Sequence, residues 1–229
     1  MSEKGGRPIL FNTEMVKAIL TGRKSQTRRA VKPQPQLAGY DGLNEDKTAA
    51  LFTCGYGTGH HYFERVELPC RPDDILYVRE TWFYESHMED KTEGMPDLPS
   101  GRYSHRYVYR ADSPDYPVNV GVGAAGWRPS IHMPREAARI FLRVTDVRVE
   151  RLQEITYEDC KAEGIWDKYK ATSEKHRENL ARMAYPVVFA ELWDSAIKRA
   201  DRELYGWAAN PLVWVISFER CAGAAKDES

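Results

Sequence analysis

The segment TEMVKAILTGRKSQTRR, residues 13–29, is the most informative part of the chain, because an amphipathic pattern runs directly into a basic cluster. Apolar side chains spaced for one helix face predict a helix over residues 14–20 that packs on a core. Asn12 or Thr13 can cap this helix, and Gly22 permits the turn that follows it. The helix therefore presents four cations beside hydroxyl and amide groups, which suits an anion or a polar nucleobase.

Further elements surround this segment. A short helix is expected to begin near Thr156 and to end at Gly164, and a second amphipathic helix is expected over residues 187–197. Apolar or alternating runs predict strands over residues 8–11, 75–79, 106–111, 140–152 and 212–218. Few strands, mixed with helices and separated by long loops, predict an α+β fold with a small β-barrel and flanking helices.

We expect a single domain over residues 1–221, followed by a disordered tail over residues 222–229. Long loop insertions are expected near residues 36–71 and 85–105, where periodicity is weak. The first of them has room for one short hairpin. The charged stretch over residues 167–184 is expected to be helical or mobile.

The composition excludes some classes of protein. With 229 residues and 42% hydrophobic residues, the chain can form a real core, and its net charge of −1 argues against a non-specific nucleic-acid coat. Neither an apolar run of roughly 18 residues nor a signal peptide is visible, so we expect a cytoplasmic protein that does not enter a membrane. Free thiols are the expected state of the four cysteines: Cys54, Cys70, Cys160 and Cys221.

From Gly22 onward, the basic segment resembles the GxKxxxxR signature of ASCH domains, which belong to the PUA-like group. The resemblance continues in order through residues 73–82, 144–154, 158–163 and 213–218. It extends to the longer ASCH proteins of phages and prophages, in which the segments around residues 127–134 and 210–214 recur. The resemblance implies a PUA-like small mixed β-barrel, with a cleft that binds RNA or modified nucleosides.

One bacterial branch of that group hydrolyses N4-acetylcytidine with a lysine, a threonine and a glutamate. Lys24, Thr27 and Glu163 match these residues, so the resemblance implies a catalytic set. Thr27 would supply a hydroxyl, and Lys24 would act as a base if burial and neighbouring arginines lower its pKa. A nearby Glu163 carboxylate would raise that pKa. The alternative is an ordinary ion pair that holds a helix to the barrel.

Eight further residues are candidates for substrate binding. Arginine side chains bind phosphates or carboxylates through forked hydrogen bonds, and tryptophans stack on bases. A histidine held between prolines can read a base edge or donate a proton. The candidates are Arg23, Arg28, Arg29, Arg79, Glu80, Trp82, Trp127 and His132. The alternatives are a solvated basic face, core aromatics and a structural histidine.

Three functions compete. The first is an amidohydrolase that acts on an acylated cytidine or a similar modified nucleoside or base. The second is a non-catalytic module that binds RNA or a modified nucleobase, and the third is a metal-assisted ribonuclease. No cofactor is expected, since nucleotide-binding glycine motifs are missing. Cys54, His60, His61 and Cys70 form a weak zinc candidate, because their spacing matches no common zinc motif.

Overall fold

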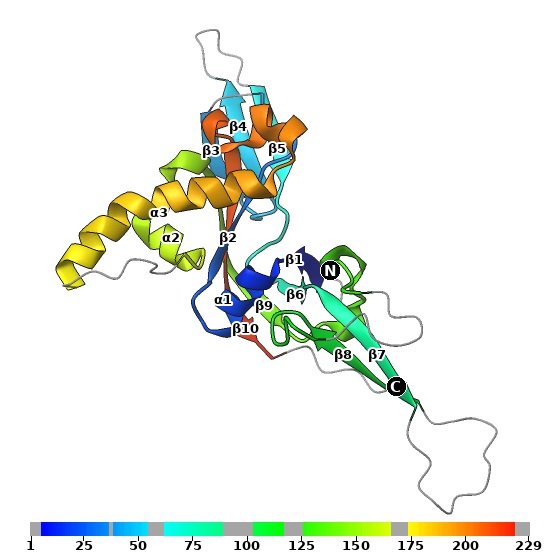
Figure 1. The fold of residues 1–229 in the computed structure, drawn as a ribbon. Helices are drawn as coiled ribbons and strands as arrows, with labels where there is room; N and C mark the ends of the chain where they lie inside the picture. The colour runs from blue at the N-terminus through cyan, green and yellow to red at the C-terminus, as the bar shows by residue number, and fades with distance from the viewer. Residues whose placement is uncertain are drawn as a thin grey trace, which may run out of the picture.

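The structure is a computed structural model that describes residues 6–36, 39–54, 62–88, 103–116, 126–165 and 174–222 (Figure 1). Helices and strands are mixed within these residues, which confirms the predicted α+β class. The strands are β1 (Arg7–Leu10), β2 (Gln26–Ala30), β3 (Gly39–Leu43), β4 (Ala49–Cys54), β5 (Tyr62–Glu67), β6 (Ile75–Arg79), β7 (Trp82–Met88), β8 (Tyr103–Tyr109), β9 (Phe141–Arg151) and β10 (Leu212–Cys221).

The helices gather before β2 and between β9 and β10. The α-helices are α1 (Thr13–Leu20), α2 (Tyr157–Ala162), α3 (Glu174–Ala196) and α4 (Arg202–Tyr205). Short 3-10 turns connect the other elements: η1 (Ser130–His132), η2 (Arg135–Ala137), η3 (Leu152–Glu154), η4 (Arg199–Asp201) and η5 (Trp207–Ala209). The helix predicted over residues 187–197 is the C-terminal half of α3, which begins earlier, inside the charged stretch.

A five-stranded sheet in the order β1-β6-β9-β10-β2 forms the centre of the molecule. β1 runs parallel to β6, whereas the other neighbours are antiparallel. β1 and β2 are the two edge strands, so the described strands form an open sheet and not the small closed barrel that we expected. β3, β4 and β5 pair with one another, as do β7 and β8, and no described strand joins the two edges of the main sheet.

The first expected insertion is more ordered than a loop with one hairpin. β3, β4 and β5 form a three-stranded antiparallel sheet. Ala50 and Phe52 of β4 are fully buried and join the main core. From Ala50 to Thr53, buried and half-buried side chains alternate as in a strand, but the glycine-rich and polar residues around β4 obscure this pattern in the sequence.

The second expected insertion begins as a strand. β7 and β8 form a two-stranded antiparallel ribbon that projects from one end of the main sheet (Figure 1). The strand predicted over residues 106–111 is the second half of β8 and ends at Tyr109. Residues 89–102 of the expected loop lie outside the described residues, as does most of the expected disordered tail.

β10 separates two hydrophobic clusters. Leu212, Trp214 and Ile216 pack on one face of the sheet with α1, whereas Val213 and Val215 pack on the other face with α2 and α3. The sequence of a strand that is buried on both faces is a continuous apolar run. This pattern is why β10 could be predicted. On this second face, α2 and α3 lie over β2 (Figure 1).

α2 begins and ends as its sequence predicts. Thr156 caps it through a reciprocal pair with Asp159: the Thr156 hydroxyl accepts from the Asp159 N–H, and the Thr156 N–H donates to the Asp159 carboxylate at 3.0 Å. Glu163 is the C-cap, and Gly164 follows with a φ of +92°. Only glycine adopts this conformation readily, so the chain can turn sharply away at the point where α2 meets β2.

We predict that Gly164→Ala destabilises the protein more than Gly22→Ala does. Both glycines have positive φ, which costs an alanine about 1–2 kcal/mol. At Gly164 the added Cβ would also lie 3.0 Å from the Ala18 Cβ and 3.2 Å from the Lys24 Cβ, whereas nothing lies within 4 Å at Gly22. Such crowding adds about 1–3 kcal/mol. Urea unfolding of both variants measures the difference, and equal losses of stability would contradict the prediction.

Candidate functional site

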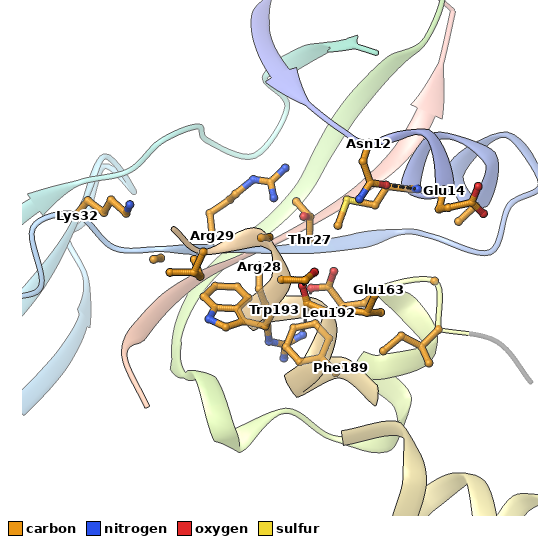
Figure 2. A pocket seen from close by; sticks show the side chains of 18 residues that line it. Asn12, Glu14, Thr27, Arg28, Arg29, Lys32, Glu163, Phe189, Leu192 and Trp193 are labelled. Atoms are coloured by element: carbon orange, nitrogen blue, oxygen red, sulfur yellow. Dashed lines mark hydrogen bonds and ion pairs between the residues drawn. The ribbon is translucent and has the colours of Figure 1, made fainter. Parts of the chain in front are cut away.

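A pocket of about 610 Å³ lies between α1, β2, the end of α2 and α3 (Figure 2). Small-molecule sites usually enclose about 300–1,000 Å³. The lining residues are Asn12, Glu14, Met15 and Ala18 from the α1 region; Thr27, Arg28, Arg29, Ala30 and Lys32 from β2 and the chain after it; Glu163, Gly164 and Ile165 from the end of α2; and Phe189, Leu192, Trp193, Ser195, Ala196 and Ile197 from α3 and its end. The basic segment and the short acidic helix therefore border one hollow.

Lys24 and Glu163 meet at the wall of this pocket. The Lys24 Nζ lies 2.6 Å from the Glu163 Oε2 and donates to the Glu163 main-chain carbonyl at 2.9 Å. The Lys24 side chain is completely buried, and that of Glu163 is 6% exposed. Backbone contacts fix the approach, since the Ser25 N–H donates to the Ala162 carbonyl at 2.9 Å and Lys24 bridges to Glu163.

The environment of Lys24 lowers its pKa below 10.5. Burial is the largest cause, because a desolvated ammonium is disfavoured, and the Arg29 and Arg28 charges act in the same direction. The Glu163 carboxylate opposes them through its charge and its hydrogen bond. Glu163 holds the ammonium form in place, and the surroundings ease the loss of its proton.

Thr27 lies in β2, is buried, and lines the pocket. It shares one side of the strand with Arg29, whereas Arg28 points to the other side, toward Phe189 (Figure 2). The Lys24 ammonium and the Arg29 guanidinium both lie near the ring of Phe11, at 5.7 Å and 5.2 Å from its centroid. The Phe11 ring therefore lies close to both of these cations.

Arg28 is held by carboxylates of the protein. Its side chain is fully buried, and its Nη2 lies 2.9 Å from the Glu150 carboxylate and 3.2 Å from that of Asp159. Its Nη1 lies 3.5 Å from Glu163. This guanidinium, which the sequence suggested for phosphate binding, is thus balanced inside the protein, and it is not part of a solvated face.

Asp159 links this network to α2. Burial would raise its pKa, but hydrogen bonds from Thr156 and Gln26 and the Arg28 charge lower the pKa to about 2. The carboxylate therefore stays ionised while it caps α2 and faces Arg28. Arg148, on β9, donates to the same carboxylate at 3.2 Å.

The other two predicted cations of the basic segment differ in position. Arg29 lines the pocket, and its Nη2 donates to the Leu10 carbonyl at 2.7 Å. Arg23 does not line the pocket; its Nε donates to the Thr21 hydroxyl at 2.9 Å.

Five predicted binding residues lie outside the pocket lining, near the junction of β6 and β7. Glu80 is buried and accepts two hydrogen bonds from Arg139, at 2.9 Å and 3.0 Å. Burial raises the pKa of its carboxyl group, against the effect of Arg139. The Arg79 Nη1 donates to the Ile131 carbonyl at 3.3 Å. These contacts hold segments of the fold together.

The aromatic members of that group differ in how far they are buried. Trp82 is buried with Met133 and Ala137 in a small cluster, and the Arg128 guanidinium lies 5.1 Å from its ring centroid. Its Nε1 is buried and has no hydrogen-bond partner in the described residues. Trp127 is half-buried, and His132 is exposed at the end of η1. Trp82 is thus a core aromatic, which was the alternative to base stacking.

The aromatic wall of the pocket was not predicted from the sequence. Phe189 and Trp193 line it from α3, and the Arg28 guanidinium lies 6.0 Å from the Phe189 ring centroid. The amphipathic pattern over residues 187–197 predicts that these positions are buried. Such a pattern does not distinguish a residue that lines a pocket from one that packs in the core. Glu150 and Asp159, the partners of Arg28, were also missed, because partners on distant strands and helices leave no local signal.

The weak zinc candidate falls partly outside the described residues, which lack His60 and His61. Cys70 is buried with a free thiol, and burial raises its pKa to about 12. In the part of the chain that the structure describes, no cluster of three or more histidine, cysteine or acidic side chains is placed to hold a metal ion. Across the same residues, no helix combines the length and apolar character that crossing a membrane requires.

Comparisons with known protein families, with curated proteins and with solved structures find no match for this chain.

A double-mutant cycle tests the buried pair. Lys24→Met and Glu163→Gln should each destabilise the protein by about 3–5 kcal/mol, because each leaves a buried charge without its main partner. The double variant should lose clearly less than the sum. The exposed pair of Lys17 and Glu14, 3.1 Å apart, is the matched control, and its coupling should stay below about 1 kcal/mol. Additive losses at the buried pair, measured by urea unfolding, would contradict the assignment.

Proposed function

We propose that this chain is a PUA-like protein of the ASCH type, and that it hydrolyses the exocyclic amide of an N4-acylated cytidine. The observation that carries the proposal is the buried Lys24–Glu163 pair, with a lowered lysine pKa, at the wall of a pocket that Thr27 also lines. Perturbed lysines beside a nucleophile are typical of active sites. The family resemblance supplies the substrate class.

The residues suggest a division of roles. The Thr27 hydroxyl attacks the acyl carbon, and its proton passes to the neutral Lys24 amine. Lys24 itself does not line the pocket, so it acts on Thr27 from within the wall. The proton then returns through the Glu163 carboxylate to the leaving N4 nitrogen as the carbon–nitrogen bond breaks. Water hydrolyses the acyl-threonine ester, which releases the acid and restores the hydroxyl.

The pocket also suits a base. Phe189 and Trp193 offer apolar walls on the side opposite α1, and a pyrimidine ring can stack against such side chains. With the base held there, the acylated amino group would point toward Thr27 and Glu163. The five candidates near β6 and β7 have no part in this pose.

A turnover assay tests the function. Purified protein should convert N4-acetylcytidine to cytidine and acetate, and Lys24→Met or Thr27→Ala should reduce kcat/KM at least about 100-fold, the usual contribution of a general base or nucleophile. Thr27→Ser should keep measurable activity, and Lys17→Met, outside the pocket, should match the unaltered protein. Absence of cytidine release, or full activity of the Lys24 variant, would refute the proposal.

The proposed roles of Lys24 and Glu163 also predict how kcat/KM changes with pH. If neutral Lys24 is the base, kcat/KM should rise with pH up to the lysine pKa, below 10.5, and then level off. Glu163 raises that pKa, so Glu163→Gln should move the rising limb to lower pH while also lowering the maximum. Rate profiles of the two proteins over the alkaline range measure the shift. A limb that stays in place or moves to higher pH would contradict the role of Lys24.

A non-catalytic module that binds a modified base is the second candidate. One observation favours it: the Lys24 ammonium is already satisfied by two oxygens of Glu163. Cytidine derivatives that bind in the pocket without turnover would support this reading.

A further inference from the structure

The pocket lies at an edge of the main sheet. α1 packs on one face of this sheet and α3 packs on the other, yet residues of both helices line the pocket. β2 is an edge strand, and its successive residues 27–30 all line the pocket as well. Because successive side chains of a strand point to opposite faces, a cavity that contacts all of them must wrap around the edge. Figure 2 shows β2 passing between Glu14 of α1 and Phe189 of α3.

Alternate residues of β2 turn their main-chain groups toward this edge. In an antiparallel pair, residues that exchange hydrogen bonds with the partner strand alternate with residues whose N–H and C=O groups point outward. Val31 donates to the Leu212 carbonyl at 3.0 Å, and Phe218 donates to the Ser25 carbonyl at 2.8 Å. These two bonds set the alternation, so the odd-numbered residues of this stretch pair with β10 and the even-numbered residues face outward.

Arg28 and Ala30 are the even-numbered residues of β2 that border the pocket. Within the described residues, no hydrogen-bond partner lies on the outward side of their main-chain N–H and C=O groups. Before them, α2 already occupies the edge, since Ser25 donates to the Ala162 carbonyl at 2.9 Å, and Pro33 beyond β2 has no N–H. Arg28 is buried and Ala30 is half-buried, and main-chain groups in such places normally have partners. A ligand in the pocket can supply them.

This short free edge suits a planar ring better than an extended peptide. A peptide that adds a strand to a sheet pairs with several outward-facing residues in a row, and β2 offers Arg28 and Ala30 alone within its bounds. Phe189 and Trp193 line the same pocket from α3, so a flat ring can stack on them while its polar edge faces the strand. A pyrimidine base carries donors and acceptors along one such edge.

We propose that the outer edge of β2 recognises the cytosine ring through the main chain. The Arg28 carbonyl accepts a hydrogen bond from the N4 nitrogen, and the Ala30 N–H donates to the O2 oxygen. Arg28 follows Thr27, so N4 lies at the reacting end of the pocket and O2 lies farther along the strand. The proposal rests on the function proposed above and specifies how its substrate is selected.

Titration calorimetry with cytidine and 2-thiocytidine tests the hydrogen bond from Ala30. Because sulfur is a weak acceptor, the thio compound should bind the unaltered protein about tenfold more weakly. Ala30→Pro removes the N–H without breaking a bond to β10, since an edge strand tolerates proline where its N–H faces outward. In this variant the two compounds should bind within about twofold of each other.

Ala30→Val is the size-matched comparison, because valine and proline add the same number of carbon atoms to alanine and valine keeps the N–H. Whatever its affinity for cytidine, this variant should keep the ratio of about tenfold between the two compounds. Urea unfolding checks both variants, and Ala30→Pro should unfold near the midpoint of Ala30→Val. Failure of Ala30→Pro to fold would contradict the outward direction of the Ala30 N–H.

Uridine tests the Arg28 carbonyl. Its ring carries an oxygen where cytosine carries the N4 nitrogen, so two acceptors would face each other at this carbonyl. Uridine should therefore bind the unaltered protein at least about tenfold more weakly than cytidine does.

Three results would overturn the proposal. The first is a cytidine-to-2-thiocytidine ratio near one in the unaltered protein. The second is the same ratio in Ala30→Pro as in Ala30→Val, and the third is equal binding of uridine and cytidine, absence of binding included.

The binding ratios need no turnover, so the two proposals can fail separately. Hydrolysis of N4-acetylcytidine by a protein that does not distinguish cytidine from 2-thiocytidine or uridine would refute only the main-chain recognition. The expected ratios in a protein without hydrolysis would refute only the amidohydrolase.

Discussion

The contact between the start of β2 and the end of α2 is the constraint on which the site depends. A main-chain hydrogen bond from Ser25 to Ala162 and the ion pair of Lys24 with Glu163 join segments that are 139 residues apart. Both charges are buried, so neither can be removed without leaving the other unsolvated. The turn at Gly164 lets the chain leave α2 without displacing Lys24. Pocket, charge network and helix packing all follow from this contact.

A second layer of acids surrounds that pair. Asp159 caps α2 and faces Arg28, and Glu150 binds the same guanidinium from β9. Arg28 in turn approaches the Glu163 oxygen that Lys24 does not use. The Glu163 carboxylate is therefore fixed from two sides. This fixation gives the lysine a defined partner while burial weakens the lysine's hold on its proton.

Much of the main sheet could be predicted from sequence, because β6, β9 and β10 carry apolar or alternating runs and α2 carries its own capping residues. β2 could not, since Gln26, Thr27 and Arg28 read as polar and are buried only through partners on distant elements. The meeting of Lys24 with Glu163 was inferred through a family resemblance, and helix length or spacing alone would not have shown it. The helix pattern predicted that Phe189 and Trp193 are buried, but it could not show that they line a pocket.

The place of β10 in the sheet has a consequence for synthesis on the ribosome. β2 and β9, which carry Thr27 and Glu150, both pair with β10 and not with each other. Residues 212–221 follow all the other described strands in the chain, so the basic segment cannot be locked in register before β10 has been made. Nascent chains that stop short of this strand lack the element that holds the two halves of the pocket together.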